Sequence, residues 1–149
     1  MSLTRAQFES ELVSRRSGMM QIVSMAVTTT GANASLNGPI GFAVRQAGGS
    51  VANVTSVADS DIATVSDDSI DQMFDMAEYR LLLNIKGMWG KVDISSGPFS
   101  QSLSQFADQL DNDIKAMKEA ITAQYGYGGY SFEAGVIDLG SMQTDPDAL

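Results

Sequence analysis

The sequence predicts an all-α protein: a small bundle of three main helices plus short helices, with a long loop region and an extended C-terminal tail that contains a short strand. Apolar residues recur at helical spacing in three segments, 8–26, 70–88 and 99–125. The chain has 149 residues, which is enough for one domain with a core of its own. We therefore expect a helical domain over residues 1–125 and a tail over residues 126–149.

The first helix is expected at residues 3–25. Thr4 and Gln7 have the spacing of a capping box, in which each side chain bonds the backbone N–H of the other residue. An apolar stripe at helical spacing follows and comprises Phe8, Leu12, Met19, Ile22, Val23 and Ala26. This stripe predicts the face that the helix turns toward the core.

Residues 28–58 form a low-charge segment of loop and short helix, in which Arg45 is the only charged residue. Pro39 is suited to open a short helix at residues 39–47, because the first helical position needs no backbone N–H. Residues 25–36 are compatible with an extended chain. Two alternatives stay open for this segment: it is a mobile loop, or it becomes ordered against neighbouring subunits.

The central helix is predicted at residues 67–88, after a short turn at residues 57–65 in which Asp59 is the expected N-cap and Ile62 and Val65 face inward. Asp67, Asp68 or Ser69 can cap the central helix, and Gly87 can take the left-handed conformation at its end. Its two apolar faces comprise Ile70, Met73, Phe74, Ala77, Leu81, Ile85 and Met88 on one side, and Met76, Tyr79, Leu82 and Leu83 on the other. A helix that is apolar on two sides needs partners on two sides.

A long amphipathic helix of roughly seven turns is predicted at residues 99–125, between Pro98 and Gly126. Its single stripe comprises Phe99, Leu103, Phe106, Leu110, Ile114, Met117, Ile121 and Tyr125. In the tail, residues 136–139 predict a strand without a partner in the chain. Because a lone strand is unstable, we expect it to pair with the sheet edge of another protein. The predicted partner-binding residues are Tyr127, Tyr130, Phe132, Val136, Ile137 and Leu139.

The net charge of −9 is unevenly distributed, with +2 over residues 1–58 and −11 over the remainder. A basic first half beside an acidic second half suits head-to-tail contacts between subunits, and Arg15 and Arg16 are the predicted subunit contacts. A solvated acidic surface is the simpler explanation of the same pattern. The acidic balance argues against a nucleic-acid-binding face.

The chain contains no Cys and no His, which removes thiolate chemistry, imidazole acid–base catalysis, Ser–His triads and the usual zinc ligands. Asp67, Asp68, Asp71 and Asp75 lack the glycine and terminal glutamate of a calcium loop. The Gly- and Tyr-rich run at residues 125–130 lacks the strand–loop–helix context of a phosphate loop. No segment is long and apolar enough to predict a membrane span. We therefore expect no enzymatic activity, no metal site and no cofactor.

Six short motifs lie between residues 57 and 140: an acidic turn at Asp59 and Asp61, AEYRLL at 77–82, VDISSGP at 92–98, SLSQ at 102–105, YGYGG at 125–129 and GVIDL at 135–139. In this pattern the chain resembles the small head-to-tail connector (adaptor) proteins of long-tailed bacteriophages. The resemblance implies a structural virion protein, an all-α bundle that assembles as a homo-oligomeric ring, commonly of twelve copies, beneath the portal.

The resemblance also implies that the C-terminal extension docks on the portal protein, and that the ring offers a platform to a tail or neck protein such as a stopper or tail terminator. DNA would pass through the channel without sequence-specific binding, because an acidic lining repels phosphates. The protein would act in the neck of the virion, after assembly in the host cytoplasm. The alternatives are a small cytoplasmic regulatory protein whose C-terminal strand captures a partner, and an enzyme completed across an interface, against which the lack of His and Cys weighs.

Overall fold

The computed structural model describes residues 3–89 and 99–126, with side chains from residue 104 onward in the second range. These residues form five α-helices and two 3₁₀ turns and contain no strand, which confirms the all-α prediction for them. The helices are α1 (Arg5–Ile22), α2 (Asn37–Gln46), α3 (Asp59–Ile62), α4 (Ile70–Trp89) and α5 (Phe99–Tyr125), and the 3₁₀ turns are η1 (Ala34–Leu36) and η2 (Asp67–Ser69).

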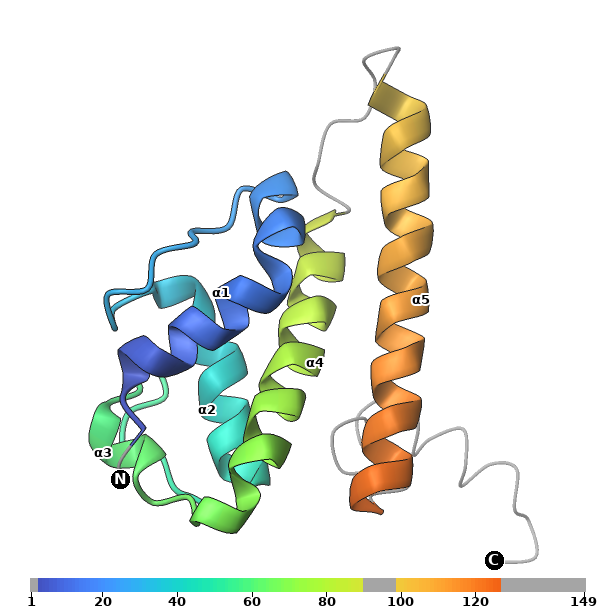
Figure 1. Ribbon diagram of the computed structural model, residues 1–149. Coiled ribbons are helices and arrows are strands. Elements are labelled where there is room, and N and C mark those ends of the chain that lie inside the picture. The colour runs from blue at the N-terminus through green and yellow to red at the C-terminus, as the bar shows by residue number, and fades with distance from the viewer. Residues whose placement is uncertain (1–2, 90–98, 127–149) are drawn as a thin grey trace, which may run out of the picture.

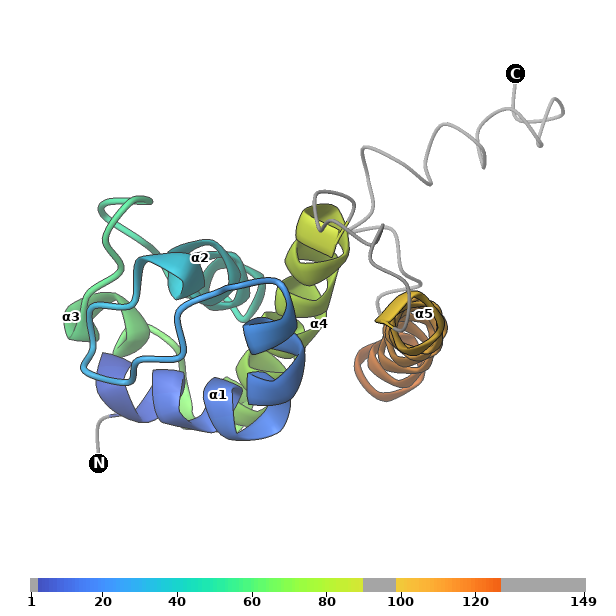
Figure 2. The ribbon, with the colours of Figure 1, turned by 90° about the horizontal axis from the view of Figure 1, so that it is seen from above.

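Helix α4 lies at the centre of the molecule. Helices α1 and α2 pack on one side of it, and α5 stands along its other side (Figure 1). Seen from above, α4 separates α5 from the other helices (Figure 2). The prediction of partners on two sides is thus confirmed. The buried apolar residues of α4 come from both predicted faces: Met73, Met76, Ala77, Tyr79, Leu81, Leu82 and Ile85.

Helix α1 begins with the predicted capping box. Thr4 Oγ1 accepts the backbone N–H of Gln7 at 3.2 Å, and the Thr4 N–H donates to Gln7 Oε1 at 2.9 Å. The helix ends at Ile22, three residues before the predicted end. There Ser24 adopts a left-handed φ of 62°, and the Met25 N–H bonds the Met20 carbonyl at 2.8 Å. This turn directs the chain back toward α2.

The low-charge segment of residues 28–58 packs against its own chain, an arrangement that neither of the two predicted alternatives included. Its apolar side chains Leu36, Ile40, Ala43, Val44 and Val57 are buried in the core. Helix α2 starts at Asn37, two residues before the expected start, and the end of the segment expected to be extended, residues 34–36, forms the 3₁₀ turn η1.

Gly49 allows this segment to pass close to the core. A Cβ atom placed on it would lie 2.9 Å from Val44 Cγ1 and 2.8 Å from Val65 Cγ2, closer than side-chain carbons approach. Only glycine therefore fits between these two valines.

Asp59 does not cap its own helix, contrary to the prediction. Ala58 holds the N-cap position of α3, and Asp61 reaches back to accept the Ala58 N–H at 2.9 Å. Asp59 instead accepts the Arg5 N–H at 2.6 Å, so its carboxylate satisfies the start of α1. Ile62 and Val65 are buried, as predicted.

The ends of α4 differ from their predicted positions. The expected capping residues 67–69 form the 3₁₀ turn η2, and α4 proper starts at Ile70. At the other end the helix continues through Gly87 to Trp89, where the Trp89 and Phe106 rings pack with centroids 4.8 Å apart. The last turn of α4 therefore packs on α5 instead of ending at the glycine.

Helix α5 has the predicted bounds and ends before Gly126, whose φ is 73°. Phe106, Leu110 and Ile121 are buried, and Ile114, Met117 and Tyr125 are partly buried, so one stripe faces α4. The predicted positions Phe99 and Leu103 have no described side chains, and the strand predicted at residues 136–139 lies outside the described residues.

Candidate functional site

The partner-binding residues predicted in the tail lie outside the described residues. They are Tyr127, Tyr130, Phe132, Val136, Ile137 and Leu139, and their role stays a prediction. The predicted subunit contacts Arg15 and Arg16 are described, and both bind carboxylates of their own chain.

A charged cluster joins α1, α4 and α5; we call it the junction cluster, and it comprises Arg15, Arg16, Asp75, Glu78 and Asp113. Arg16 Nε lies 2.7 Å from Glu78 Oε2, and its Nη1 lies 2.7 Å from Asp113 Oδ2. Arg15 Nη1 lies 2.9 Å from Glu78 Oε1 and 3.4 Å from Asp75 Oδ1. The cluster therefore connects all three main helices.

A kink in α1 allows two consecutive arginines to bind the same carboxylate. Neighbouring residues on a regular helix point about 100° apart. Arg16 has non-helical backbone angles, φ −136° and ψ 20°, and the guanidinium groups of Arg15 and Arg16 both reach Glu78. The predicted contact of these arginines with another subunit is untested, but the structure gives both charges partners within the chain.

Tyr125 ties the end of α5 to the same cluster. Its hydroxyl donates to Asp75 Oδ2 at 2.7 Å. Partial burial and the bond to Asp75 raise the pKa of Tyr125 well above its usual range. Burial by itself lowers the pKa of Arg15, but the Glu11 and Glu78 carboxylates outweigh this effect, so the pKa of Arg15 is raised. At neutral pH Tyr125 therefore stays protonated and Arg15 stays charged.

A second cluster, the inner cluster, holds residues 28–58 against α1. Glu9 is fully buried and accepts Arg5 Nε at 2.8 Å, the Gly31 N–H at 2.7 Å and the Asn33 N–H at 2.9 Å. Arg5 also donates to the Asn33 carbonyl at 2.7 Å, the Val57 carbonyl at 2.8 Å and Asn37 Oδ1 at 2.7 Å. These partners satisfy the buried charges, so the inner cluster has a structural role.

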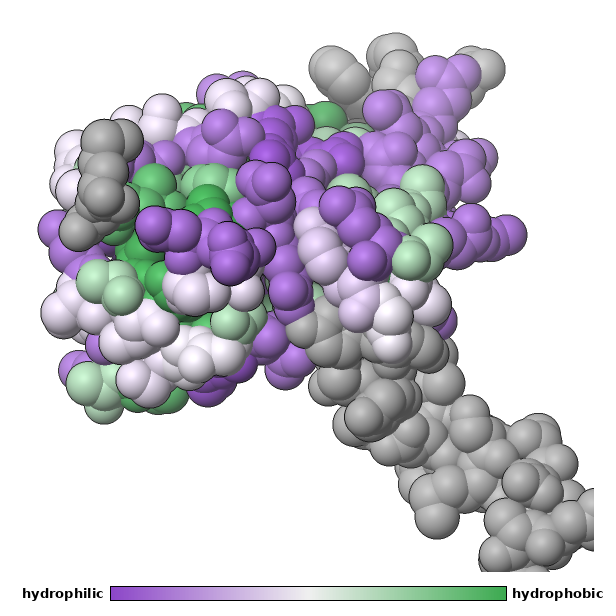
Figure 3. Space-filling view, turned by 60° about the horizontal axis from the view of Figure 1, so that its bottom comes forward, coloured by the Kyte–Doolittle hydropathy of each residue, from purple (hydrophilic) through white to green (hydrophobic). Residues whose placement is uncertain are grey.

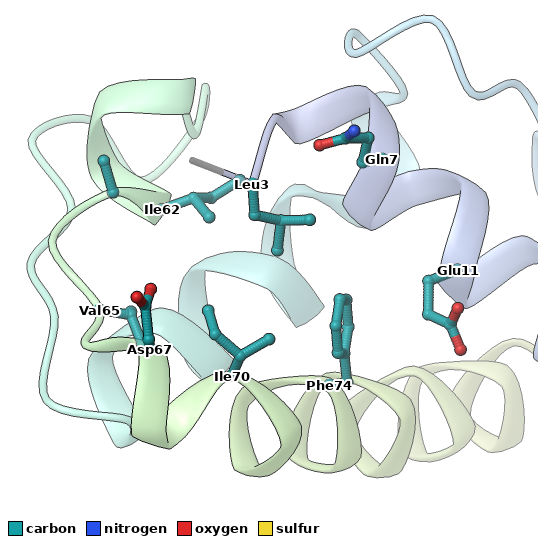
Figure 4. Close-up of a pocket in the computed structure, with 9 residues that line it drawn as sticks. Leu3, Gln7, Glu11, Ile62, Val65, Asp67, Ile70 and Phe74 are labelled. Atoms are coloured by element: carbon teal, nitrogen blue, oxygen red, sulfur yellow. The ribbon is translucent and has the colours of Figure 1, made fainter. Parts of the chain in front are cut away.

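A groove lies between the start of α1, α3 and the start of α4; we call it the acidic groove. Its volume is about 540 Å³, and it is lined by Leu3, Gln7, Glu11, Ile62, Ala63, Val65, Asp67, Ile70 and Phe74. The apolar side chains point into the cavity, and Asp67 and Glu11 lie toward its two ends (Figure 4). Figure 3 shows hydrophobic side chains in a hollow bordered by hydrophilic ones on this side of the molecule.

The chain around this groove carries negative charge. Between residues 57 and 79 there are seven acidic residues and no basic residue. Asp67, Asp68 and Asp71 are exposed at the start of α4. Glu11 pairs with Arg15 at 2.7 Å, which leaves Asp67 as the acidic lining residue without an ion pair among the described residues. The groove thus combines an apolar floor with an acidic border.

Within residues 3–89 and 99–126 no group of three or more acidic, His or Cys side chains is arranged to hold a metal ion. In the same residues, no helix combines the length and hydropathy needed to cross a membrane. Comparisons of the chain with protein-family models, with curated proteins and with solved structures give no match. Function therefore has to be inferred from the chain's own sequence and geometry.

Proposed function

We propose that this protein is a structural head-to-tail adaptor of a tailed bacteriophage, which forms a ring on the portal and links the capsid to the tail around the DNA channel. The proposal rests on the set of six motifs over residues 57–140. It is supported by the way in which the motif residues that the structure describes hold the bundle together. The motif at 77–82 packs the scaffold: Ala77, Tyr79, Leu81 and Leu82 are buried in the core. Glu78 of the same motif binds Arg15 and Arg16 of α1, and Arg16 in turn binds Asp113 of α5.

The charges of the described residues support a scaffold role. Arg5, Arg15 and Arg16 neutralise carboxylates inside the bundle, whereas the acidic residues at the start of α4 face solvent. An exposed acidic surface lets DNA pass a ring without adhering to it, because like charges repel. We propose no enzymatic activity, since the described ionisable clusters serve to join helices.

Deleting residues 133–149 tests the docking role of the tail. The bundle from α1 to α5 ends before this segment, so the truncated protein should keep its helical circular dichroism and its melting temperature. It should lose binding to the portal protein of the same genome, while the full chain forms rings on that portal in electron micrographs. Equal portal binding by the two proteins would contradict the docking role.

A pair of single substitutions sharpens the same test. Ile137→Asp places a charge in the apolar run that is predicted to dock, and should weaken portal binding. Ser141→Asp adds the same charge outside that run and serves as the matched control. If the full chain binds no portal but captures one other protein as a monomer, the regulatory alternative replaces the adaptor proposal.

A further inference from the structure

Arg45 on α2 and Arg80, which contacts α2 through Phe42, have no carboxylate partner among the described residues. The Arg80 guanidinium lies over the Phe42 ring, 5.1 Å from its centroid, and Arg45 is exposed. Phe42 and Arg45 are three residues apart on α2 and so share a face of that helix. By contrast, Arg5, Arg15, Arg16 and Lys86 all form ion pairs within the described chain. We call Phe42, Arg45 and Arg80 the α2 face.

The loop that follows α2 carries an exposed apolar side chain and returns to α2 near Arg45. A Cβ atom on Gly41 would lie 3.6 Å from Arg45 Nη1 and 3.3 Å from Val57 Cγ2, so the guanidinium lies near the point where the 48–57 loop returns to α2. That loop carries Val54, which is 64% exposed, the highest value among the large apolar residues described. The helix α2 and the loop that follows it thus carry both exposed apolar surface and positive charge that is unpaired among the described residues.

Arg80 of the α2 face and Phe74 of the acidic groove point in different directions from α4, because six residues separate them on the helix. Helix α4 meets α1 through Phe74, whose ring lies 4.9 Å from that of Phe8, and through Glu78. Arg80 is two residues beyond Glu78, which rotates it by about 200° around the helix, away from α1. Phe74 lines the acidic groove, so the groove opens on the α1 side.

We propose that the acidic groove of one copy binds the α2 face of a second copy. The proposal rests on the proposed function and names the contact by which its subunits would join. The acidic border with Asp67 complements Arg45 and Arg80, and the apolar floor complements Phe42 and Val54. Because the two surfaces differ and face different ways, the contact is heterologous and repeats from copy to copy, which produces a ring when the rotation closes.

Cysteine cross-linking tests the contact directly, because the native chain contains no Cys. Ala63→Cys places a thiol in the groove, and Arg45→Cys places one on the α2 face; both positions are exposed. Mixed and treated with a short bismaleimide, these two proteins should give a cross-linked heterodimer. Ala116→Cys, at an exposed position on α5, is the control partner for Ala63→Cys and should give no heterodimer above background.

Charge substitutions provide an independent measurement. Asp67→Arg and Arg45→Glu should each abolish the concentration-dependent rise in mass measured by sedimentation equilibrium. A mixture of the two variants should restore it, because each variant keeps one native surface and the substituted surfaces again have opposite charge. Circular dichroism melting of each variant confirms that the fold is retained.

The outcomes separate this inference from the adaptor proposal. Heterodimers at the Ala116→Cys background level, with normal portal binding, would overturn the groove contact and leave the adaptor role intact. A dominant homodimer of Ala63→Cys alone would mean a groove-to-groove contact and would also overturn the inference. Specific heterodimers without portal binding would retain the contact and remove the adaptor role.

Discussion

Two ion pairs of the same spacing lie on α1 in opposite surroundings. The Arg5 and Glu9 side chains are 4% and 0% exposed, whereas those of Arg15 and Glu11 are 30% and 42% exposed. Both pairs are separated by four residues, the usual spacing of a surface pair on a helix. Spacing along the helix predicts which two residues form an ion pair. How much the pair contributes to stability depends on which part of the chain covers it.

The covering element is the segment of residues 28–58. Glu9 accepts backbone N–H groups of this segment, and Arg5 donates to its carbonyl groups, so a stretch without acidic residues of its own is held by two charges on α1. The exposed pair of Arg15 and Glu11 instead lies at the edge of the junction cluster, to which Arg15 belongs, and solvent reaches and screens these charges.

Glu9→Gln should have the largest effect on stability. The substitution keeps the size of the side chain but leaves the Arg5 charge buried without its partner. Breaking a buried ion pair in this way costs about 3–5 kcal/mol of unfolding free energy. Urea denaturation followed by circular dichroism measures the loss.

Glu11→Gln is the matched control for this comparison, since it makes the same change on the same helix in an exposed pair. It should cost between about 0 and 1 kcal/mol. Equal losses for the two variants would show that burial does not distinguish the pairs.

The substitutions Leu82→Ala and Phe106→Ala measure how much the apolar core contributes to stability, for comparison with the ion pairs. Leu82 is fully buried in α4 and Phe106 is 8% exposed in α5, so each truncation should cost about 2–5 kcal/mol. Because α5 packs on one side only, Phe106→Ala should speed hydrogen exchange mainly in α5, and Leu82→Ala throughout the bundle. A melting change no larger than that of Ser104→Ala, an exposed control on α5, would mean that these contacts do not stabilise the fold.

Glu78→Gln should have a smaller effect than Glu9→Gln. Glu78 is nearly buried and accepts from both Arg15 and Arg16, but each arginine retains another carboxylate, Glu11 or Asp113. We expect a loss of about 1–3 kcal/mol, typical of a hydrogen-bonded charged group. A loss as large as that of Glu9→Gln would show that the junction cluster is as tightly constrained as the inner cluster.

Tyr125→Phe should have the smallest effect at neutral pH and a visible one in alkali. The raised pKa of Tyr125 means that folding favours the protonated phenol. This contribution is complete below the ordinary tyrosine pKa of about 10 and is lost as the pH rises through the folded value. The alkaline loss of stability, measured by urea denaturation at a series of pH values, should therefore be shallower in Tyr125→Phe.

The variant Asp75→Asn checks the cause of this pH effect. It removes the charged acceptor of the Tyr125 hydroxyl, so tyrosinate absorption should show the phenol titrating nearer its ordinary pKa. Identical alkaline profiles for the wild type and Tyr125→Phe would contradict the role of the Tyr125–Asp75 bond.

Much of the scaffold could be predicted from local patterns. The apolar stripes of 70–88 and 99–125 identify the two helices that pack together, and Thr4 with Gln7 identifies the start of α1, because these signals depend on spacing within a few residues. The bounds of α5 are as predicted because the apolar stripe runs along the whole helix and a glycine follows its last residue.

The long-range contacts that polar residues make in the fold could not be predicted in this way. Asp59 has the pattern of a cap for α3 but accepts the N–H of Arg5, and the binding of Arg15 and Arg16 to Glu78 was not predicted. These partners lie more than fifty residues away along the chain, and no local spacing encodes them. The acidic groove was missed for the same reason, since two segments far apart along the chain, 3–11 and 62–74, line it.

The mass of the full chain by light scattering, alone and with the portal protein, tests the adaptor account most directly. Alone, the protein should be a monomer or a loose oligomer whose mass falls as salt is raised, because screening shortens the reach of charged contacts to about 8 Å at physiological ionic strength. With the portal, many weak contacts are brought together and should close a ring. A salt-insensitive monomer that forms no ring on the portal would contradict the account.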